Sequence, residues 1–327
     1  MDLLDRAFLK ALTESPSVGT ACGPVLNLIS KRFGSAYART FVPDGFCFFQ
    51  KNGYSPQDLE GVFIAHMDEV GGCVYGSRPE GGFNTRFWGN KANIFVNAVL
   101  QGFDYLAQDG RCAFPVSAEM AIVGDEERIV LHGEGIRPYR TGWTFKQSTV
   151  FDEDVIEGKA LDPRVTAFSV LEAVRAIDDG RIGAMFVMAE ECAMDVARKG
   201  VFFLQANAPN LNLIVNADVP WIENLGEGRL DLPAIRIFEG RNFIDPSFGI
   251  RVSDLLQAQG VELHLSAAKS GSQTILFTPI APTLSIALPS DAIHISKYRM
   301  SLTGTERCTE LLKAIGMNLL NGDLHTK

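Results

Sequence analysis

The segment Gly61-Val-Phe-Ile-Ala-His66-Met-Asp68-Glu69 gives the first indication of the fold. Its apolar run predicts a buried strand over 61–65, and its polar residues follow directly at the carboxyl end of that strand. A strand of this kind is typical of a sheet that is covered on both faces and that presents functional groups at one edge.

Helix and strand patterns alternate on either side of this segment. Helices are expected over 2–13 and 24–33, and strands over 37–42 and 46–50. After about residue 152 the alternation resumes with a helix over 164–177, whose apolar residues recur on one face. Further strands are expected over 184–189, 211–217, 234–238, 261–266 and 283–288, and further helices over 247–259 and 304–320. Short links between alternating elements predict an α/β fold, a mixed open sheet with helices on both faces.

The intervening segment 72–151 has a different character. Glycine, aromatic residues and short alternating runs at 94–100, 121–123 and 128–132 replace the helical periodicity. This pattern predicts a smaller all-β, barrel-like domain of about 80 residues, which is within the usual domain size. The α/β domain is therefore expected to be discontinuous, comprising residues 1–71 and 152–327.

Composition excludes several classes of protein. The 327 residues carry a formal net charge of -9, and 46% of them are hydrophobic. Nucleic acids and anionic membranes select basic surfaces, so we expect neither as a partner. No apolar run approaches the roughly 20 residues of a membrane helix, and the acidic start does not resemble a signal peptide. The six cysteines are scattered without a CxxC pair, which is typical of reduced thiols in a cytoplasmic protein.

Acidic and histidine residues gather just beyond the predicted strand ends. The candidates are His66, Asp68, Asp162, Glu190, Glu191, Asp218 and His294. Imidazoles and carboxylates from one edge of a sheet form a ligand set that zinc, cobalt or manganese accepts. Without cations the converging carboxylates would repel one another, whereas two cations about 3.5–4 Å apart could hold a water molecule and a carbonyl between them.

Local explanations exist for some of these residues. Asp162-Pro163 would also suit the N-cap and first position of a helix, and Glu190-Glu191 could form a solvated turn. The remaining histidines, His132, His264 and His325, fit no constellation, so we expect no functional role for them.

Five motifs together resemble the M42 family of metallo-aminopeptidases, the glutamyl aminopeptidase-like group that forms tetrahedral particles. The motifs are Ala65-His-Met-Asp-Glu-Val-Gly71, Gly158-Lys-Ala-Leu-Asp-Pro-Arg164, Ala189-Glu-Glu191, Asn216-Ala-Asp-Val219 and Ile293-His294. Their order and spacing match across nearly the whole chain, with the β insert between the first two motifs.

The resemblance implies an aminopeptidase that hydrolyses N-terminal residues of short peptides with two divalent metal ions, zinc first, with cobalt or manganese as alternatives. It implies that Asp162 bridges the metals, and that the other metal ligands are His66 and Asp218 at one site and Glu191 and His294 at the other. It further implies that Glu190 is the general base for the hydroxide that bridges the metals, and that Asp68 orients the ring of His66. A homo-oligomer, from a dimer up to a dodecamer, is expected for the same reason.

The sequence also departs from the family. Pro163 replaces a second acidic residue, and because an X–Pro bond adopts the cis form at little cost, we predict a cis Asp162–Pro163 bond. The segments 270–274 and 290–293 differ from the family pattern, which puts substrate choice in doubt. Two alternatives therefore remain open: a metal-dependent deacylase or amidohydrolase of small N-acyl compounds, and a catalytically weak relative that acts in assembly or binding.

Overall fold

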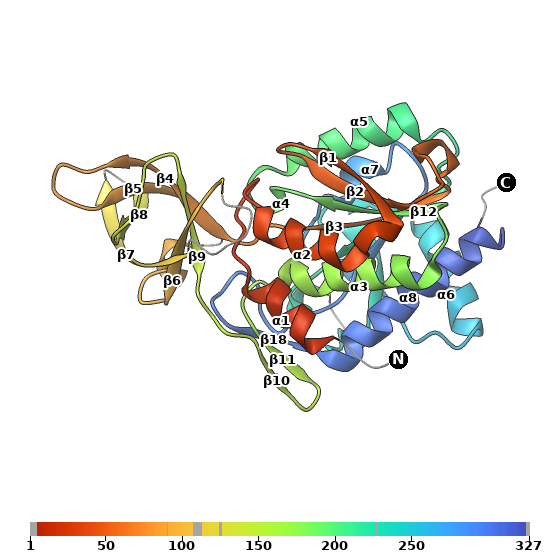
Figure 1. Ribbon diagram of the computed structural model, residues 1–327. Helices are drawn as coiled ribbons and strands as arrows, with labels where there is room; N and C mark the ends of the chain where they lie inside the picture. The colour runs from red at the N-terminus through yellow and green to blue at the C-terminus, as the bar shows by residue number, and fades with distance from the viewer. Residues whose placement is uncertain (1–4, 90, 107–112, 124–125, 226–227, 325–327) are drawn as a thin grey trace.

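The computed structural model describes residues 5–89, 91–106, 113–123, 126–225 and 228–324. It has an α/β body from which a smaller β-barrel projects (Figure 1). The predicted fold class, a mixed sheet with helices on both faces and a separate all-β unit, is confirmed.

The main sheet of the body has nine strands, which positions the residues of interest. Its order is β1 (Tyr37–Val42), β2 (Phe46–Lys51), β12 (Ile182–Val187), β3 (Gly61–His66), β13 (Leu213–Asp218), β17 (Thr283–Ala287), β14 (Ala234–Glu239) and β15 (Asn242–Phe243), with β16 (His264–Ala268) paired to β14. Strands β12, β3, β13 and β17 run parallel to one another. Their carboxyl ends therefore meet at one edge of the sheet.

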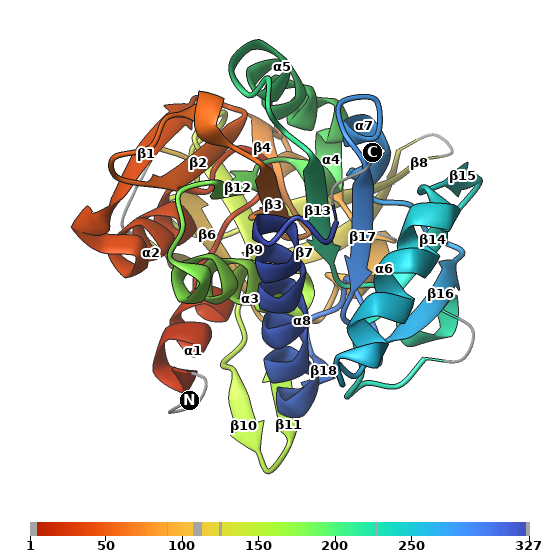
Figure 2. The same cartoon turned by 90° about the vertical axis from the view of Figure 1, so that its right-hand side faces the viewer.

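Helices cover the sheet on both faces (Figures 1 and 2). The larger core cluster contains buried residues of α1 (Arg6–Glu14), α2 (Gly23–Phe33), α3 (Leu161–Ile177), α6 (Pro246–Ala258) and α8 (Leu302–Leu320). The smaller cluster, on the other face, contains residues of α5 (Arg198–Asn207) and α7 (Thr274–Phe277). Helix α3 is central because Phe168, Leu171 and Val174 of its apolar stripe are buried in the core, and Ile177 at the end of the stripe is partly buried.

Short elements complete the body. A single helical turn, α4 (Glu190–Ala193), follows β12. The 3-10 turns are η1 (Gly34–Ala36), η2 (Pro56–Asp58), η3 (Ala92–Ile94), η4 (Met194–Ala197) and η5 (Ile222–Asn224). A three-stranded sheet, which the sequence pattern does not predict, joins β10 (Val150–Asp152), β11 (Val155–Gly158) and β18 (Tyr298–Ser301).

The barrel is closed in the order β4-β5-β8-β7-β6-β9. Its strands are β4 (Gly71–Ser77), β5 (Phe83–Trp88), β6 (Leu100–Asp104), β7 (Phe114–Val123), β8 (Glu126–His132) and β9 (Thr141–Phe145). The alternating run at 94–100 is not one continuous strand, because it starts in the η3 turn and β6 begins only at Leu100. Phe95 instead leaves the η3 turn and fills the barrel, with ring centroids 4.9 Å from both Trp143 and Phe145. The bulky side chain of Phe95 fills space inside the barrel, and the backbone around it does not pair as a strand.

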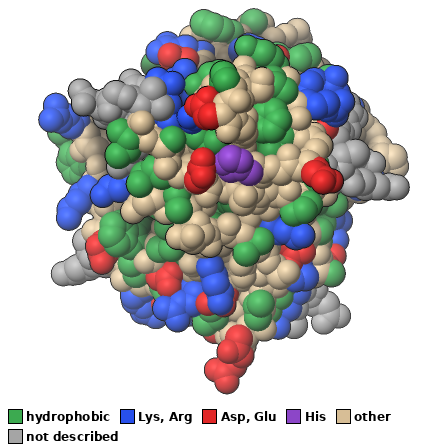
Figure 3. All heavy atoms as spheres, turned by 90° about the vertical axis from the view of Figure 1, so that its left-hand side faces the viewer, with side chains coloured by type: hydrophobic (Ala, Val, Ile, Leu, Met, Phe, Trp, Pro, Cys, Tyr) green, Lys and Arg blue, Asp and Glu red, His purple; other side chains and the backbone are tan. Residues whose placement is uncertain are grey.

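On the barrel side of the molecule, Lys and Arg side chains form several separate groups with acidic and hydrophobic side chains between them (Figure 3). Within the described ranges, no helix combines the length and the apolar character that crossing a membrane requires. The five described cysteines are free thiols, and three of them are buried. Cys112 lies outside the described residues.

Candidate metal centre

The candidate site lies at the edge where the parallel strands end. His66 is the last residue of β3, and Asp218 is the last residue of β13. Glu190 and Glu191 open α4 directly after β12, Asp162 is the second residue of α3, and His294 lies in the loop between β17 and β18. The structure thus brings together residues that come from five separate segments of the chain.

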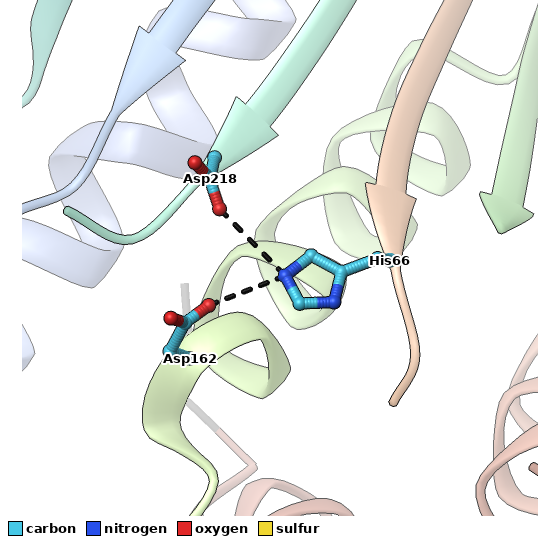
Figure 4. Close-up of side chains that lie close together, drawn as sticks. All are labelled: His66, Asp162 and Asp218. Atoms are coloured by element: carbon cyan, nitrogen blue, oxygen red, sulfur yellow. Dashed lines mark hydrogen bonds and ion pairs between the residues drawn. The ribbon is translucent and has the colours of Figure 1, made fainter. Parts of the chain in front are cut away.

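His66, Asp162 and Asp218 form one group of potential ligands (Figure 4). The Nε2 atom of His66 lies 3.2 Å from Asp162 Oδ1 and 3.7 Å from Asp218 Oδ1. All three side chains point toward a common centre. The imidazole is buried, with 2% exposure, so water competes little for these polar atoms.

Asp162, Glu191 and His294 form a second group that shares Asp162 with the first. His294 Nε2 lies 3.1 Å from Glu191 Oε2 and 3.5 Å from Asp162 Oδ2. The two oxygens of Asp162 therefore face different histidines. Within each group the potential ligand atoms lie within 4.8 Å of one another, and nitrogen and oxygen donors of these types suit divalent cations. The residues present fit a pair of such cations that share one carboxylate.

Asp68 contacts both His66 of the first group and the backbone of Glu191 of the second group. Its Oδ1 lies 3.4 Å from His66 Nδ1, the ring nitrogen that faces away from Asp162. The same carboxylate accepts hydrogen bonds from the backbone N–H groups of Glu190, at 2.9 Å, and Glu191, at 3.1 Å. A carboxylate in this place fixes both the orientation of the imidazole and the position of the α4 turn.

The electrostatics of the cation-free chain reflect this crowding. Burial on its own would lower the pKa of His294, but Glu191 and Asp162 raise the pKa to about 11. His66 shows the same balance, and its hydrogen bonds to three carboxylates raise its pKa well above the ordinary value. Protonated imidazoles thus supply the positive charge that the carboxylates require. Divalent cations would supply the same charge in their place.

Glu190 differs from its neighbours because its side chain makes no hydrogen bond or ion pair with any residue in the described part of the chain. Burial raises the pKa of this carboxyl group well above its usual value, and the nearby charges of Asp218 and Glu191 add to the shift although His66 opposes it. A carboxyl group that is unpaired and easily protonated is suited to proton transfer.

Backbone strain is concentrated at the same place. Ala160, Ala189 and His294 have φ angles of 50°, 62° and 60°, in the left-handed region that non-glycine residues rarely adopt. Ala160 and Ala189 directly precede α3 and α4, the helices that carry the carboxylates. Such strain persists only where surrounding structure enforces it, and it clusters at functional sites.

The structure places Asp162 and the remaining histidines as follows from their contacts, and the N-cap explanation does not account for Asp162. Asp162 is not helical in its backbone (ψ 117°), and its carboxylate faces the imidazoles. The Asp162–Pro163 bond is cis, which confirms that prediction. His132 lies in the barrel, 3.2 Å from Glu119, and His264 lies in the edge strand β16; His325 is outside the described residues.

Sequence reasoning missed several residues that support the site. Tyr298 is buried, and its hydroxyl accepts a hydrogen bond from the backbone N–H of Asp162 at 2.7 Å. Nothing in the local sequence indicates this contact, because it depends on the pairing of β18 with β11. A buried ion pair joins Lys159 Nζ to Glu69 Oε1 at 2.7 Å, and Arg164 lies 3.7 Å from the same oxygen. The basic residues Lys159 and Arg164, which flank Asp162 in the sequence, were the available signal for this ion pair.

The segment 290–293 shapes the loop that carries His294. Asp291 forms an ion pair with Arg299 at 2.7 Å, and the hydroxyl of Ser290 donates to the carbonyl oxygen of Ala292 at 2.6 Å. These contacts brace the loop on both sides. These contacts involve the loop that carries His294, and they help to hold that loop in place.

The fold of this chain, an α/β body with an inserted barrel, is similar to that of solved aminopeptidase structures over nearly the whole chain. The TET1 peptidase of Pyrococcus horikoshii matches with a TM-score of 0.79 at 16% identity, covering 95% of this chain and 98% of its own. A TET aminopeptidase from a marine sediment thaumarchaeote matches with a TM-score of 0.79 at 15% identity, covering 97% and 98%. An aminopeptidase from Desulfurococcus kamchatkensis matches with a TM-score of 0.77 at 17% identity, covering 94% and 93%.

At these identities the likeness establishes the fold. No family profile matches the chain, and no curated protein sequence matches it. What the protein does must therefore be argued from its own side chains.

Proposed function

We propose that the protein is a metal-dependent aminopeptidase that removes N-terminal residues from short peptides. The observation that carries this proposal is the pair of ligand groups that share Asp162, with the unpaired carboxyl group of Glu190 beside them. The fold it shares with solved aminopeptidases supports the same conclusion.

Two divalent cations would each be held by one of the ligand groups. His66, Asp162 and Asp218 would hold one cation, and Asp162, Glu191 and His294 would hold the other. Zinc is the first choice for this donor set, and cobalt or manganese also accept it. When bound, such cations polarise a carbonyl group and lower the pKa of a water molecule between them.

The remaining chemistry belongs to the protein. Glu190 takes the proton from the attacking water and later passes it to the leaving amine, which requires a carboxyl group that is not tied to a partner. Asp68 holds the ring of His66 and the turn that carries Glu190, so proton transfer and cation binding keep a fixed relative geometry.

The proposal extends to assembly. The P. horikoshii TET1 peptidase assembles into a tetrahedron or a large octahedral shell. Because the chains share a fold over nearly their full lengths, we expect this protein to form a homo-oligomer, from a dimer up to a dodecamer. Multi-angle light scattering of the purified full chain measures the number of subunits, and a strictly monomeric mass would contradict this part of the proposal.

A substrate panel tests the reaction. The full chain, loaded in turn with Zn²⁺, Co²⁺ or Mn²⁺, is assayed on aminoacyl amides, short peptides and N-acyl amino acids. We expect cleavage only of substrates with a free amino group. Cleavage of the N-acyl compounds alone would make the protein a deacylase, and no cleavage by a metal-loaded protein would favour a role in assembly or binding.

A single substitution tests the assigned base. Glu190→Gln should lower turnover by about 10²–10⁴-fold, which is the usual contribution of a positioned acid–base group, while metal content stays unchanged. Asp195→Asn is the matched control, because this acidic residue lies in the same segment, is 84% exposed and pairs only with Arg198 among the described residues. Near-native turnover of the Gln variant would remove Glu190 from the mechanism.

A further inference from the structure

The two oxygens of Asp218 face in different directions. Oδ1 faces His66 Nε2 at 3.7 Å, within the first ligand group. Oδ2 faces Arg236 Nη2 at 3.2 Å, on the side away from that group. Arg236 comes from β14, two strands across the sheet from β13, and its side chain is fully buried. The contact therefore joins a candidate metal ligand to a buried cation.

Arg236 is itself held in place by two further partners. Glu239 Oε1 lies 2.9 Å from Nη2, and Ser285 Oγ lies 2.8 Å from Nε. A planar guanidinium group can contact three partners in fixed directions, which an ammonium group cannot do. Arg236 and Glu239 form a buried pair, with side-chain exposures of 0% and 1%, and such pairs persist where further hydrogen bonds support the charges.

The segment 272–274 supplies those hydrogen bonds to Glu239. The backbone N–H of Ser272 donates to Glu239 Oε2 at 3.0 Å, and its hydroxyl lies 2.9 Å from the same oxygen. The hydroxyl of Thr274 lies 3.3 Å from Glu239 Oε1. These side chains are all buried. The sequence departure in this segment therefore has a structural role behind Asp218.

The same segment also reaches the strand that carries Asp218. Gln273 Nε2 donates to Asn216 Oδ1 at 2.9 Å, and Asn216 Nδ2 donates to Thr274 Oγ1 at 2.9 Å. Asn216 lies two residues before Asp218 on β13, so the two side chains leave the strand on the same face. The end of β13 is thus fixed both directly and through Arg236.

We propose that Arg236 is a positioning residue for Asp218, and that Glu239 and the segment 272–274 hold it in place. The guanidinium group occupies Oδ2 and leaves Oδ1 as the oxygen that can bind a cation beside His66. This inference rests on the proposed metal-dependent function. It assigns to the segment 272–274 a role in metal affinity rather than in substrate choice.

Partners of metal ligands typically contribute about 10–100-fold to metal affinity. Loss of Arg236 should therefore weaken one of the two cation sites by that factor and leave the other unchanged. A single Arg236→Met change would leave Glu239 buried without a counter-charge, so the test uses the neutral double variant Arg236→Met/Glu239→Gln. Arg236→Lys keeps the positive charge but loses the planar guanidinium group and its fixed donor directions, so it should weaken the same site.

The experiment titrates Co²⁺ into the cation-free full chain and follows both binding heat and the visible Co²⁺ absorption. The control is Arg307→Gln, because Arg307 also pairs with two acidic residues, Asp231 and Glu262, yet lies outside the metal centre. We expect two Co²⁺ sites in the wild type and the control, and one weakened site with an altered absorption band in both Arg236 variants. Circular dichroism of the cation-free proteins establishes that the variants are folded.

The outcomes separate the two proposals. Two wild-type affinities in either folded Arg236 variant would overturn the positioning role and leave the dinuclear site intact. If the double variant does not fold, the Lys variant decides the question by the same criterion. A wild-type protein that binds fewer than two Co²⁺ ions would overturn the proposed site and, with it, this inference.

Discussion

His294 Nε2 lies 3.5 Å from Asp162 Oδ2, although one residue is in a loop near the end of the chain and the other begins the helix that follows the barrel. The opposite oxygen of Asp162 faces His66. Asp162 is therefore the only described residue that belongs to both ligand groups. Its removal should have consequences that the removal of a histidine does not.

The first prediction follows from this sharing. Asp162→Asn should reduce the metal content of the dialysed protein at both sites, whereas His294→Ala should reduce it at one site only. Inductively coupled plasma mass spectrometry measures the ratio of metal to protein. His264→Ala, in the edge strand, serves as the control with full metal content, and equal losses in the Asn and Ala variants would argue against a shared ligand.

The second prediction concerns the buried ion pair of Lys159 and Glu69. Lys159→Met leaves the Glu69 carboxylate buried with only its hydrogen bonds and Arg164 nearby, and it should lower the free energy of unfolding by about 3–5 kcal/mol. Replacing both partners by apolar residues should cost less than replacing the lysine alone. Urea unfolding measures both values. The control Lys51→Met breaks a surface pair with Asp178 and should cost at most about 1 kcal/mol.

The third prediction is a pH dependence of stability at the start of α8. Burial alone would raise the pKa of Asp154, but hydrogen bonds from Thr303 and Ser301 lower it below its ordinary value. A lowered folded-state pKa means that this stabilisation is present above the ordinary value of about 3.9 and disappears as the pH falls through the lowered pKa.

Asp154→Asn should therefore lower the free energy of unfolding by about 1 kcal/mol near neutral pH, the usual contribution of a helix cap. The difference from the wild type should shrink toward pH 3. Thermal unfolding at a series of pH values measures it, with Asp152→Asn in the same hairpin as the control. A difference that grows as the pH falls would contradict the assignment.

The fourth prediction compares two glycines of α8. A Cβ atom at Gly304 would lie 2.5 Å from the backbone carbonyl oxygen of Leu230, whereas one at Gly316 would lie 2.5 Å from the side-chain tip of Ile177. A backbone atom cannot move aside, but a side-chain methyl group can rotate. Gly304→Ala should therefore cost about 1–3 kcal/mol through overpacking, and Gly316→Ala should cost less because the gain in helix propensity offsets it. Equal destabilisation in urea unfolding would contradict this explanation.

Much of the fold follows from local patterns. The buried run before His66 is a strand, and the apolar stripe ending at Ile177 is a helix, as their periodicities predict. The alternating run at 94–100 does not form a strand before Leu100, and Phe95 packs into the barrel interior. The pairing of β11 with β18 could not be predicted, since it joins segments that lie far apart in the chain.

The candidate site divides in the same way. His66 and Asp218 were predictable as candidates because each ends an apolar strand, at the edge of the sheet where functional groups gather. Tyr298 and Arg236 were not, because each acts through an element whose neighbours are set by the sheet order. The segment 270–274 was recognised as unusual, but its hydrogen bonds to Glu239 and Asn216 could not be predicted, because they join residues that are distant in the chain.

The sequence by itself determined most of the strands and helices of the α/β body, and it determined which imidazole and carboxylate groups stand next to the strand ends. These properties depend on residues that are close together in the chain. Only the tertiary structure decided that Asp162 stands between His66 and His294, and that Arg236 reaches Asp218. Those distances follow from the strand order and from the packing of α3 against the sheet, which bring distant segments into contact.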